Sequence, residues 1–342
     1  MQSALNRQTI KVYDEVYVDG KKSAVLNVAK TEAANDKMMA MREKFSGWLW
    51  ADQERADRLA AYYNENYNNL VVREYDGSYL TTPGIASHWS WRPHQKRVIA
   101  RIIQSGNTYV AHAVGGGKTS EYIGAIMEMR RLGLVRKPMV AVPNHMLAQF
   151  TKEWYEQYPT ARLAIADDKR FHTDKRKQFV ANVALDDLDA IIITHSSFGM
   201  IPVSAEFENG IIEREINQYR EVLAEIKKEG GDNRITRSRV EKQIERLEQR
   251  LVSRKGRKDA TFTFEEMGVD HLTIDEAHLF RKLDFTPAMS NLKGISPDGS
   301  QMAWDLYIKS QYLNSIRPGR GLVLGSGTPI TNTMAELWSL SR

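Results

Sequence analysis

A glycine-rich string is the first feature whose residue types suit chemistry. It reads AHAVGGGKTS at positions 111–120, between an apolar run and a segment with helical spacing. Three successive glycines let backbone N–H groups turn toward one point and hold a phosphate without side chains in the way. Lys118 then supplies a charge for the phosphate oxygens, and Thr119 a hydroxyl for Mg²⁺. The string predicts a triphosphate-binding loop, although His112 stands where the general pattern has glycine, and a flexible turn is the alternative.

A pair of adjacent carboxylates, Asp275 and Glu276, follows the apolar residues 272–274. The carboxyl end of a central parallel strand is where doubly wound sheets place their ligands. Asp275 would hold Mg²⁺, and Glu276 would orient and deprotonate an attacking water. His278 could sense the terminal phosphate or link to a third string. A structural network of buried acids is the alternative.

The third string, LGSGTPITNTMAELW at 324–338, also follows an apolar run. Thr328 is placed to couple the acid pair to whatever moves on hydrolysis. The alternative is an ordinary strand-to-helix turn in which Thr331 or Asn332 caps the next helix. In this order the three strings indicate a motor driven by ATP, not simply a protein that binds it.

The run GTPITNTMAELWSL resembles the third motif of Swi/Snf-type motors in helicase superfamily two, and DEAH at 275–278 fits the same family. The resemblance implies a first RecA-like lobe with ATP and Mg²⁺ as cofactors, and DNA as partner, duplex in preference to single-stranded. It implies two metal ligands, Thr119 and Asp275. It also implies five catalytic residues, namely Lys118, Asp275, Glu276, His278 and Thr328.

Three further strings resemble motifs of the same family. WRPHQKRVIARI at 91–102 resembles the adenine-recognition motif, in which Gln95 would read the adenine edge. VAVPNHMLAQFTKEW at 140–154 and IIITHSSF at 191–198 resemble motifs Ia and Ib, which contact the DNA backbone in family members. The resemblance thus assigns nucleotide binding to Arg92, Gln95, Gly115, Gly116, Gly117, Lys118, Thr119 and Ser120. It assigns nucleic-acid contacts to Asn144, His145, Thr194, His195 and Ser196.

A narrower resemblance involves His112, the P-N-H string at 143–145 and the phrase FEEMGVDHLTIDEAH. These are similar to a group of very large phage and mobile-element proteins that join a Swi/Snf-like helicase to an adenine-N6 DNA methyltransferase. This chain has no N-P-P-[YF] or D-P-P-[YF] string, so a methyltransferase module is expected only as a partner. The implied setting is a DNA-processing or anti-restriction machine.

Strand and helix patterns alternate from about 86 to 342. Apolar runs predict strands near 108–112, 138–142, 162–166, 189–194, 271–275 and 321–325. This alternation predicts an α/β fold, a RecA-like parallel sheet with helices on both faces. Residues 1–85 are expected to be a mainly helical N-terminal region.

The lobe is interrupted between 203 and 260. Apolar residues there repeat at intervals of three and four on both sides of Gly230 and Gly231, which predicts an antiparallel coiled-coil hairpin. Four basic residues close its second helix, namely Arg254, Lys255, Arg257 and Lys258. They favour either a solvated stalk whose basic end complements the helix dipole or an arm that contacts DNA or a partner.

Composition agrees with an intracellular enzyme. The 342 residues include no cysteine, which excludes disulfides and cysteine-ligated zinc. No stretch is apolar enough to suggest a membrane span or a signal peptide, and a cytoplasmic location in a bacterial or phage-infected cell is expected. An excess of 48 Lys and Arg over 43 Asp and Glu permits a nucleic-acid partner without requiring one.

The family resemblance implies that hydrolysis occurs between two RecA-like lobes. The sequence ends directly after the third string, so the chain is expected to be a fragment, or to receive a second lobe in cis or in trans. An RNA-unwinding motor and a non-catalytic ATP-binding scaffold are the alternatives. The G-T-P-x-x-N run argues against the first, and the intact Lys118, Asp275 and Glu276 argue against the second.

Overall fold

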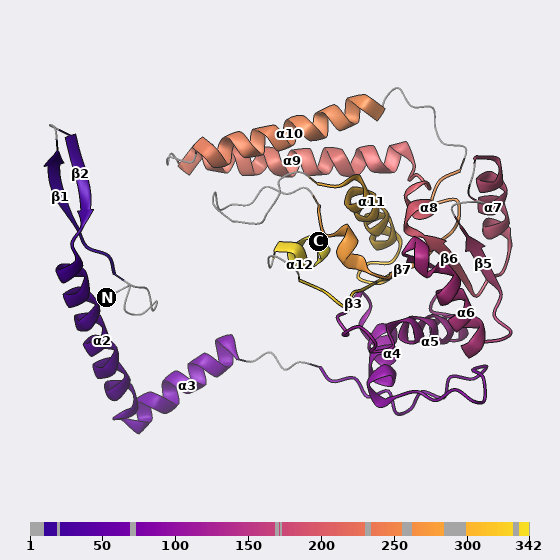
Figure 1. Cartoon of the computed structure of the whole chain (residues 1–342), viewed down its shortest axis with the longest axis horizontal. Helices are drawn as coiled ribbons and strands as arrows, with labels where there is room; N and C mark the ends of the chain where they lie inside the picture. Colours follow the sequence, from indigo (N-terminus) through magenta and orange to yellow (C-terminus); the bar gives the residue numbers. More distant parts are fainter. Residues whose placement is uncertain are drawn as a thin grey trace. The chain divides into compact units, whose positions relative to one another are not determined.

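The chain divides into two compact units, Met1–Glu74 and Tyr75–Arg342. The computed structural model describes residues 10–18, 21–68, 73–167, 171, 173–229, 234–254, 262–283, 299–330 and 335–341 (Figure 1). Tyr75, Leu80 and Ile85 pack in the core of the second unit.

The first unit begins with a β-hairpin. Strands β1 (Tyr13–Val18) and β2 (Lys21–Leu26) pair antiparallel, with Tyr13 opposite Leu26. An Asp-Gly dipeptide separates the two strands in the sequence. This dipeptide, when segments of alternating apolar and polar residues flank it, is a strong indication of a hairpin. The hairpin was not expected from the sequence.

Two helices complete the first unit. Helix α2 (Val28–Trp50) begins after Asn27, whose side chain accepts a hydrogen bond from the N–H of Lys30. Helix α3 (Gln53–Tyr67) begins after Asp52, which caps it in the same way. A side-chain oxygen at this position satisfies one of the N–H groups that a helix start leaves without a partner. The region is therefore mainly helical, as predicted.

A six-stranded sheet of parallel pairs forms the second unit, in the order β3-β8-β7-β4-β6-β5. The strands lie within one or two residues of the predicted runs, and the predicted RecA-like α/β fold is confirmed. Their bounds are β3 (Thr108–Val110), β4 (Pro138–Val142), β5 (Leu163–Ala166), β6 (Ala190–Thr194), β7 (His271–Ile274) and β8 (Leu322–Gly325).

Each central strand is buried on both faces. Met139 and Ala141 of β4 belong to one apolar cluster, whereas Val140 and Val142 belong to the other. Successive side chains of a strand point to opposite faces, so helices on both sides must cover an uninterrupted apolar run such as β4. This double cover fixes the sheet, and its carboxyl edge becomes a fixed platform for loops.

The helices of the second unit divide between these two clusters. Helices α4 (Pro93–Ser105), α5 (Lys118–Arg131) and α6 (Leu147–Gln157) contribute to the cluster that contains Val140. The cluster with Met139 includes residues of α7 (Thr173–Leu185), α8 (His195–Gly199), α9 (Ala205–Glu229), α10 (Arg234–Arg254) and α11 (Gln301–Ile316). Short segments η1 (Asn144–Met146), η2 (Ala277–Phe280) and α12 (Ala335–Ser341) complete the unit.

Helices α9 and α10 lie side by side as the predicted helical hairpin (Figure 1). Two carboxylates of α9 anchor it to α11, because Glu208 accepts a hydrogen bond of 2.9 Å from the indole N–H of Trp304 and Glu215 accepts one from the Tyr307 hydroxyl. The glycine turn at 230–231 and the basic residues 255, 257 and 258 lie outside the described residues, as does the side chain of Arg254. Within the described part of the chain, no helix combines the length and apolar character needed to cross a membrane.

Candidate nucleotide-binding site

The glycine-rich loop connects β3 to α5 at the carboxyl edge of the sheet. Gly115 and Gly117 have φ angles of 84° and 87°, in the left-handed region where L side chains are strained. Gly117 directly precedes α5, and no side chain caps the first turn of that helix. N–H groups at a helix start have no intrahelical partners and carry the positive end of the helix dipole. The loop can therefore bind an anionic oxygen.

Helix α4 packs closely against this loop. A Cβ atom on Gly117 would lie 2.4 Å from Nε2 of Gln95, so a side chain at position 117 has no room. Gln95 is buried, and its Oε1 accepts a hydrogen bond of 3.0 Å from the N–H of Arg92, which is itself exposed. The amide of Gln95 thus faces the phosphate loop, and its reading of adenine stays a prediction.

The ammonium group of Lys118 lies over the loop and donates hydrogen bonds to the carbonyl oxygens of His112 (3.0 Å) and Ala113 (3.4 Å). The third string reaches the same place. A Cβ atom on Gly327 would lie 3.5 Å from Nζ of Lys118 and 2.9 Å from a methyl carbon of Val114. Glycine at 327 therefore lets that string approach the lysine.

Asp275 and Glu276 come directly after β7, as predicted. Asp275 is buried, and burial, with the charge of Glu276 as the next cause, raises the pKa of its carboxyl from 3.8 to about 6. Glu276 has a φ of 50°, in a region that few residues other than glycine adopt. Strained backbone of this kind concentrates at functional sites. An acid pair in which Asp275 is buried and Glu276 has a strained backbone suits a site that handles a cation and a water.

Ser326 of the third string contacts both the end of β3, directly before the glycine-rich string, and His278 beside the acid pair. Its N–H donates to the carbonyl of Val110 at the end of β3 (3.1 Å), and its Oγ accepts from the N–H of Thr328 (3.0 Å). The same Oγ lies 2.9 Å from Nδ1 of His278, which is 3.0 Å from Oε2 of Glu276. A chain of contacts thus runs from the acid pair through His278 to the third string, the second of the two roles considered for that histidine. Thr328 itself is exposed.

The two hydroxyl residues after Lys118 have different surroundings. Thr119 is half-buried. Ser120 is buried, and its Oγ accepts a hydrogen bond of 3.3 Å from the amide of Gln157 in α6. The side chain of Ser120 therefore ties α5 to α6, and any nucleotide contact at this position would be made by its backbone N–H.

The candidate nucleic-acid residues follow β4 and β6. Asn144 and His145 are exposed, and Ser196 is partly exposed. Thr194 is buried, and its Oγ1 accepts a hydrogen bond from the N–H of Ser197, which caps α8. The exposed members can reach a phosphate group, whereas Thr194 acts on the local backbone.

His195 also faces the protein interior. It is buried, its Nε2 lies 3.0 Å from the carbonyl oxygen of Asp275, and burial lowers its pKa from 6.5 to about 4. As placed, the imidazole contacts the backbone of the acid pair, not solvent. It links the end of β6 to the end of β7.

Two residues beside the loop were not found from the sequence. Nε2 of His94 lies 3.0 Å from the carbonyl oxygen of Gly116. Oε1 of Glu121 lies 2.9 Å from Nδ1 of His112, and burial raises the pKa of Glu121 from 4.5 to about 8. The sequence feature that could have indicated Glu121 is an acidic residue in the first turn of the helix after the loop.

This chain is similar to parts of curated proteins. "Defense against restriction protein B" of Escherichia phage P1 is 21% identical over 372 aligned residues, which cover 95% of this chain and 16% of that protein. "Uncharacterized ATP-dependent helicase YqhH" of Bacillus subtilis (strain 168) is 30% identical over 111 residues, 32% of this chain and 19% of that protein. The chain thus spans less than a fifth of the length of either relative.

A solved structure, the "Sulfolobus solfataricus SWI2/SNF2 ATPase core in complex with dsDNA", aligns with 76% of this chain and 36% of its own, at 16% identity and a TM-score of 0.40. A family model described as a domain of unknown function matches residues 1–69. The family model described as "Probable helicase domain" matches residues 101–342, which contain the loop, the acid pair and the third string. The chain therefore belongs to this probable helicase-domain family.

Proposed function

We propose that this chain is the ATP-binding first lobe of a DNA-dependent ATPase of the Swi/Snf-like branch of helicase superfamily two. The observation that supports this most directly is the chain of contacts from Glu276 through His278 to Ser326, next to Lys118 and the glycine loop. It joins groups that could hold a phosphate, a cation and a water to a loop that can respond to them.

Each residue has a distinct role in this proposal. Mg-ATP, when bound, supplies the phosphoryl group and a cation that neutralises its charge. The N–H groups at the start of α5 hold phosphate oxygens. Lys118 gives up its hydrogen bonds to the carbonyl oxygens of His112 and Ala113 and donates to the phosphate oxygens instead. Asp275 and Thr119 would hold the cation, whose charge would favour the ionised form of Asp275, a carboxylate whose pKa is raised by burial.

Hydrolysis needs a base for the attacking water. Glu276 takes its proton, and His278 fixes the position of that carboxylate through the 3.0 Å contact. His278 also contacts Ser326, whose Oγ accepts from the N–H of Thr328. Any movement of the acid pair during hydrolysis therefore reaches the third string.

DNA is the proposed macromolecular partner, duplex in preference to single-stranded. Asn144, His145 and Ser196 are the residues whose exposure suits contacts with a phosphate backbone.

We also propose that a second RecA-like lobe, in cis or in trans, completes the site. The chain would then be part of a larger phage or mobile-element DNA-processing protein, with a methyltransferase module as a further partner, in the cytoplasm of a bacterial or phage-infected cell. The phage relative, of which the chain spans 16%, supports this setting.

ATP binding by the lysine variant is the primary test. Lys118→Ala should weaken Mg-ATP binding about 30- to 150-fold, because a partly buried charge-assisted contact contributes about 2–3 kcal/mol. Isothermal titration calorimetry measures the loss. The matched control is Lys152→Ala on α6, an exposed lysine with only an i,i+4 ion pair to Glu156, which should bind normally. Unchanged affinity in Lys118→Ala, with its circular dichroism spectrum intact, would rule out the assigned loop.

A further inference from the structure

Three side chains from different segments converge beside the phosphate loop. His94 is in the first turn of α4, His112 is in the loop, and Glu121 is in the first turn of α5. Oε1 of Glu121 lies 2.9 Å from Nδ1 of His112 and 4.0 Å from Nε2 of His94. One ligand atom from each residue lies within 4.8 Å of both others. Two imidazoles and a carboxylate thus face one point.

The carboxylate lacks a full set of partners. The Glu121 side chain has no exposed surface, and its Oε2 has no hydrogen-bond partner among the described residues. A buried acceptor left without a partner is costly, and such atoms in native structures call for an explanation such as a bound ion. A cation held by the imidazoles and by both carboxylate oxygens of Glu121 would satisfy it.

We propose that His94, His112 and Glu121 bind a transition-metal cation of the Zn²⁺ class. Imidazole and carboxylate donors suit Zn²⁺, whereas Mg²⁺ prefers oxygen ligands alone. This site is therefore distinct from the proposed Mg²⁺ site of Thr119 and Asp275. Three protein ligands leave a fourth tetrahedral position for water.

The spacing requires only small movements. Tetrahedral Zn²⁺ with bonds of about 2.0–2.1 Å places its ligand atoms about 3.3 Å apart. The observed 2.9 Å and 4.0 Å separations bracket that distance. His94 is the ligand free to adjust, because 43% of its side-chain surface is exposed while Glu121 is fixed in the interior.

Metal binding would alter the loop. Nε2 of His94 lies 3.0 Å from the carbonyl oxygen of Gly116, and a nitrogen bound to a metal cannot also donate a hydrogen bond. The cation would replace that hydrogen bond and tie α4, the loop and α5 together. The proposal concerns a second, nucleotide-independent ligand of the same loop and does not depend on ATP hydrolysis.

The test is a Zn²⁺ titration of the full chain after treatment with a chelator, without nucleotide or Mg²⁺. Calorimetry should show one tight site, and Co²⁺ as a substitute should give the visible absorption of a tetrahedral complex. His94→Ala and Glu121→Gln should each weaken binding at least about tenfold, since even residues that only orient a ligand cost 10- to 100-fold. His88→Ala, an exposed histidine of the same unit, should bind normally.

His94→Ala changes a half-exposed side chain, and Glu121→Gln keeps the shape of a buried one, so both variants should fold, as circular dichroism can verify. Absence of a tight Zn²⁺ site in the wild-type chain would overturn the proposal. Equal affinity in the folded His94→Ala and Glu121→Gln variants would overturn it too, because the bound metal would then lie elsewhere. Since the titration uses no ATP, its result is separate from that of the Lys118 test.

Discussion

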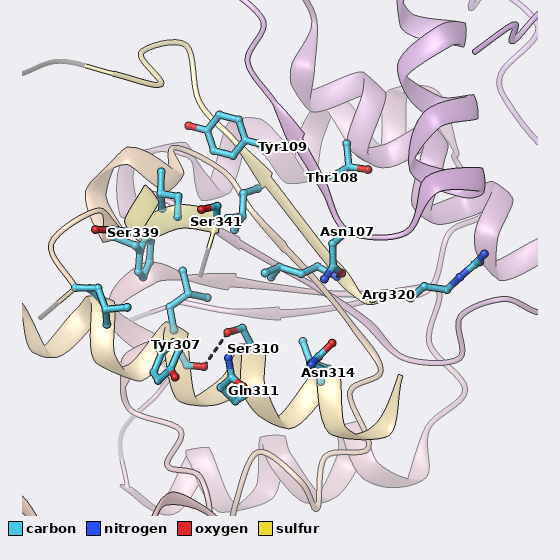
Figure 2. A pocket seen from close by; sticks show the side chains of 18 residues that line it. Asn107, Thr108, Tyr109, Tyr307, Ser310, Gln311, Asn314, Arg320, Ser339 and Ser341 are labelled. Carbon is cyan, nitrogen blue, oxygen red and sulfur yellow. Dashed lines mark hydrogen bonds between the residues drawn. The ribbon is translucent and has the colours of Figure 1, made fainter. Parts of the chain in front are cut away.

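Two regions of the second unit contrast in what they offer a ligand. The loops at the carboxyl ends of β3, β7 and β8 hold the lysine, the acid pair and the strained Glu276, whereas a cavity of about 360 Å³ lies beside β3 (Figure 2). Tyr307, Ser310, Gln311 and Asn314 reach this cavity from α11 (Figure 2). Among the described residues that line it, there is no carboxylate or lysine. This cavity and the candidate catalytic groups are thus lined by different residues.

The contrast follows from where each region lies on the sheet. Beyond the end of a strand the backbone is no longer paired in the sheet, so N–H groups, acids and hydroxyls from separate strands can meet there. The flank of a strand offers side chains of a helix at fixed spacing, which here are mostly apolar and amide groups. Leu324 lines the cavity, and Ser326, two residues later, joins the candidate site.

The largest expected effect concerns turnover. The chain alone should hydrolyse ATP very slowly with saturating duplex DNA, because an arginine from an opposing lobe contributes roughly 10³–10⁵ in rate. If a second lobe completes the site, as proposed, its addition in cis or in trans should raise turnover by about that factor. Glu276→Gln should abolish the gain while ATP still binds. Steady-state phosphate release and calorimetry measure the two quantities.

The cavity provides the control for that experiment. Gln311→Ala, which changes the cavity lining and none of the motifs, should keep normal turnover. A loss in Gln311→Ala as large as in Glu276→Gln would erase the distinction between the two regions. Robust hydrolysis by the monomeric chain alone would contradict the need for an arginine from a second lobe.

The end of β8 should tolerate almost no added volume. A Cβ atom on Gly325 would lie 1.5 Å from the hydroxyl of Tyr122, a buried residue of α5. Gly325→Ala should lower the free energy of unfolding by about 1–3 kcal/mol through overpacking. Tyr122→Phe alone should change little, because its hydroxyl has no hydrogen-bond partner among the described residues. Chemical denaturation of both single variants and the double variant measures the coupling.

In the double variant, part of the stability should return, with a coupling energy of about 1 kcal/mol or more. Gly210→Ala in α9 is the matched glycine control, since a Cβ there meets nothing within 4 Å. It should gain up to about 1 kcal/mol from helix propensity. Strictly additive effects of Gly325→Ala and Tyr122→Phe would contradict the contact between α5 and β8.

The amino end of β7 carries a buried histidine, His271, that should make the stability of the chain depend on pH. Burial, with the charge of Arg317 as the second cause, lowers the pKa of His271 from 6.5 to about 3. The unfolded chain therefore binds more protons between these values, and this contribution to stability is lost as pH falls from 6.5 toward 3. The slope is at most about 1.4 kcal/mol per pH unit, or about 2 kcal/mol at pH 5. Thermal unfolding between pH 7 and pH 5 measures it.

His271→Gln should flatten this dependence, whereas His88→Gln should keep the wild-type slope. An identical acid loss in wild type and His271→Gln would assign the effect to other groups. Both ends of β7 carry a buried ionisable residue, and only the carboxyl end is placed where a ligand can meet it.

Much of the sheet was predictable because each strand is an uninterrupted apolar run between turn residues. The run at Met139–Val142 is apolar at every position, and the two clusters that bury it explain why. The helical hairpin followed from its three- and four-residue apolar spacing. The hairpin β1–β2 was missed although an Asp-Gly dipeptide marked it, because the helical pattern of the following residues dominated the interpretation.

For the candidate site, the sequence indicated which residue types gather at the sheet edge better than it indicated which contacts they make. Parallel strands bring their carboxyl ends to one edge, so the meeting of Lys118, Asp275 and Ser326 follows from motif order. The role of Glu121 did not follow, since its burial depends on how α4 and α5 pack on each other. The interior position of His195 was hidden for the same reason. A residue next to a strand end can face either the solvent or the neighbouring strand, and sequence alone does not say which.

The smallest expected effect separates exposed from buried residues of the candidate DNA surface. His145→Ala should weaken binding to duplex DNA about fivefold, the value of one hydrogen bond of about 1 kcal/mol to a phosphate, and equally for two duplexes of unrelated sequence. Thr194→Val should leave DNA affinity nearly unchanged and instead lower the free energy of unfolding by about 1 kcal/mol, because Oγ1 of Thr194 caps α8. Fluorescence anisotropy at fixed salt and chemical denaturation measure the two effects. If Thr194→Val cost more DNA affinity than His145→Ala, the buried strand end would be the contact surface, and the division between exposed contact residues and buried positioning residues would be wrong.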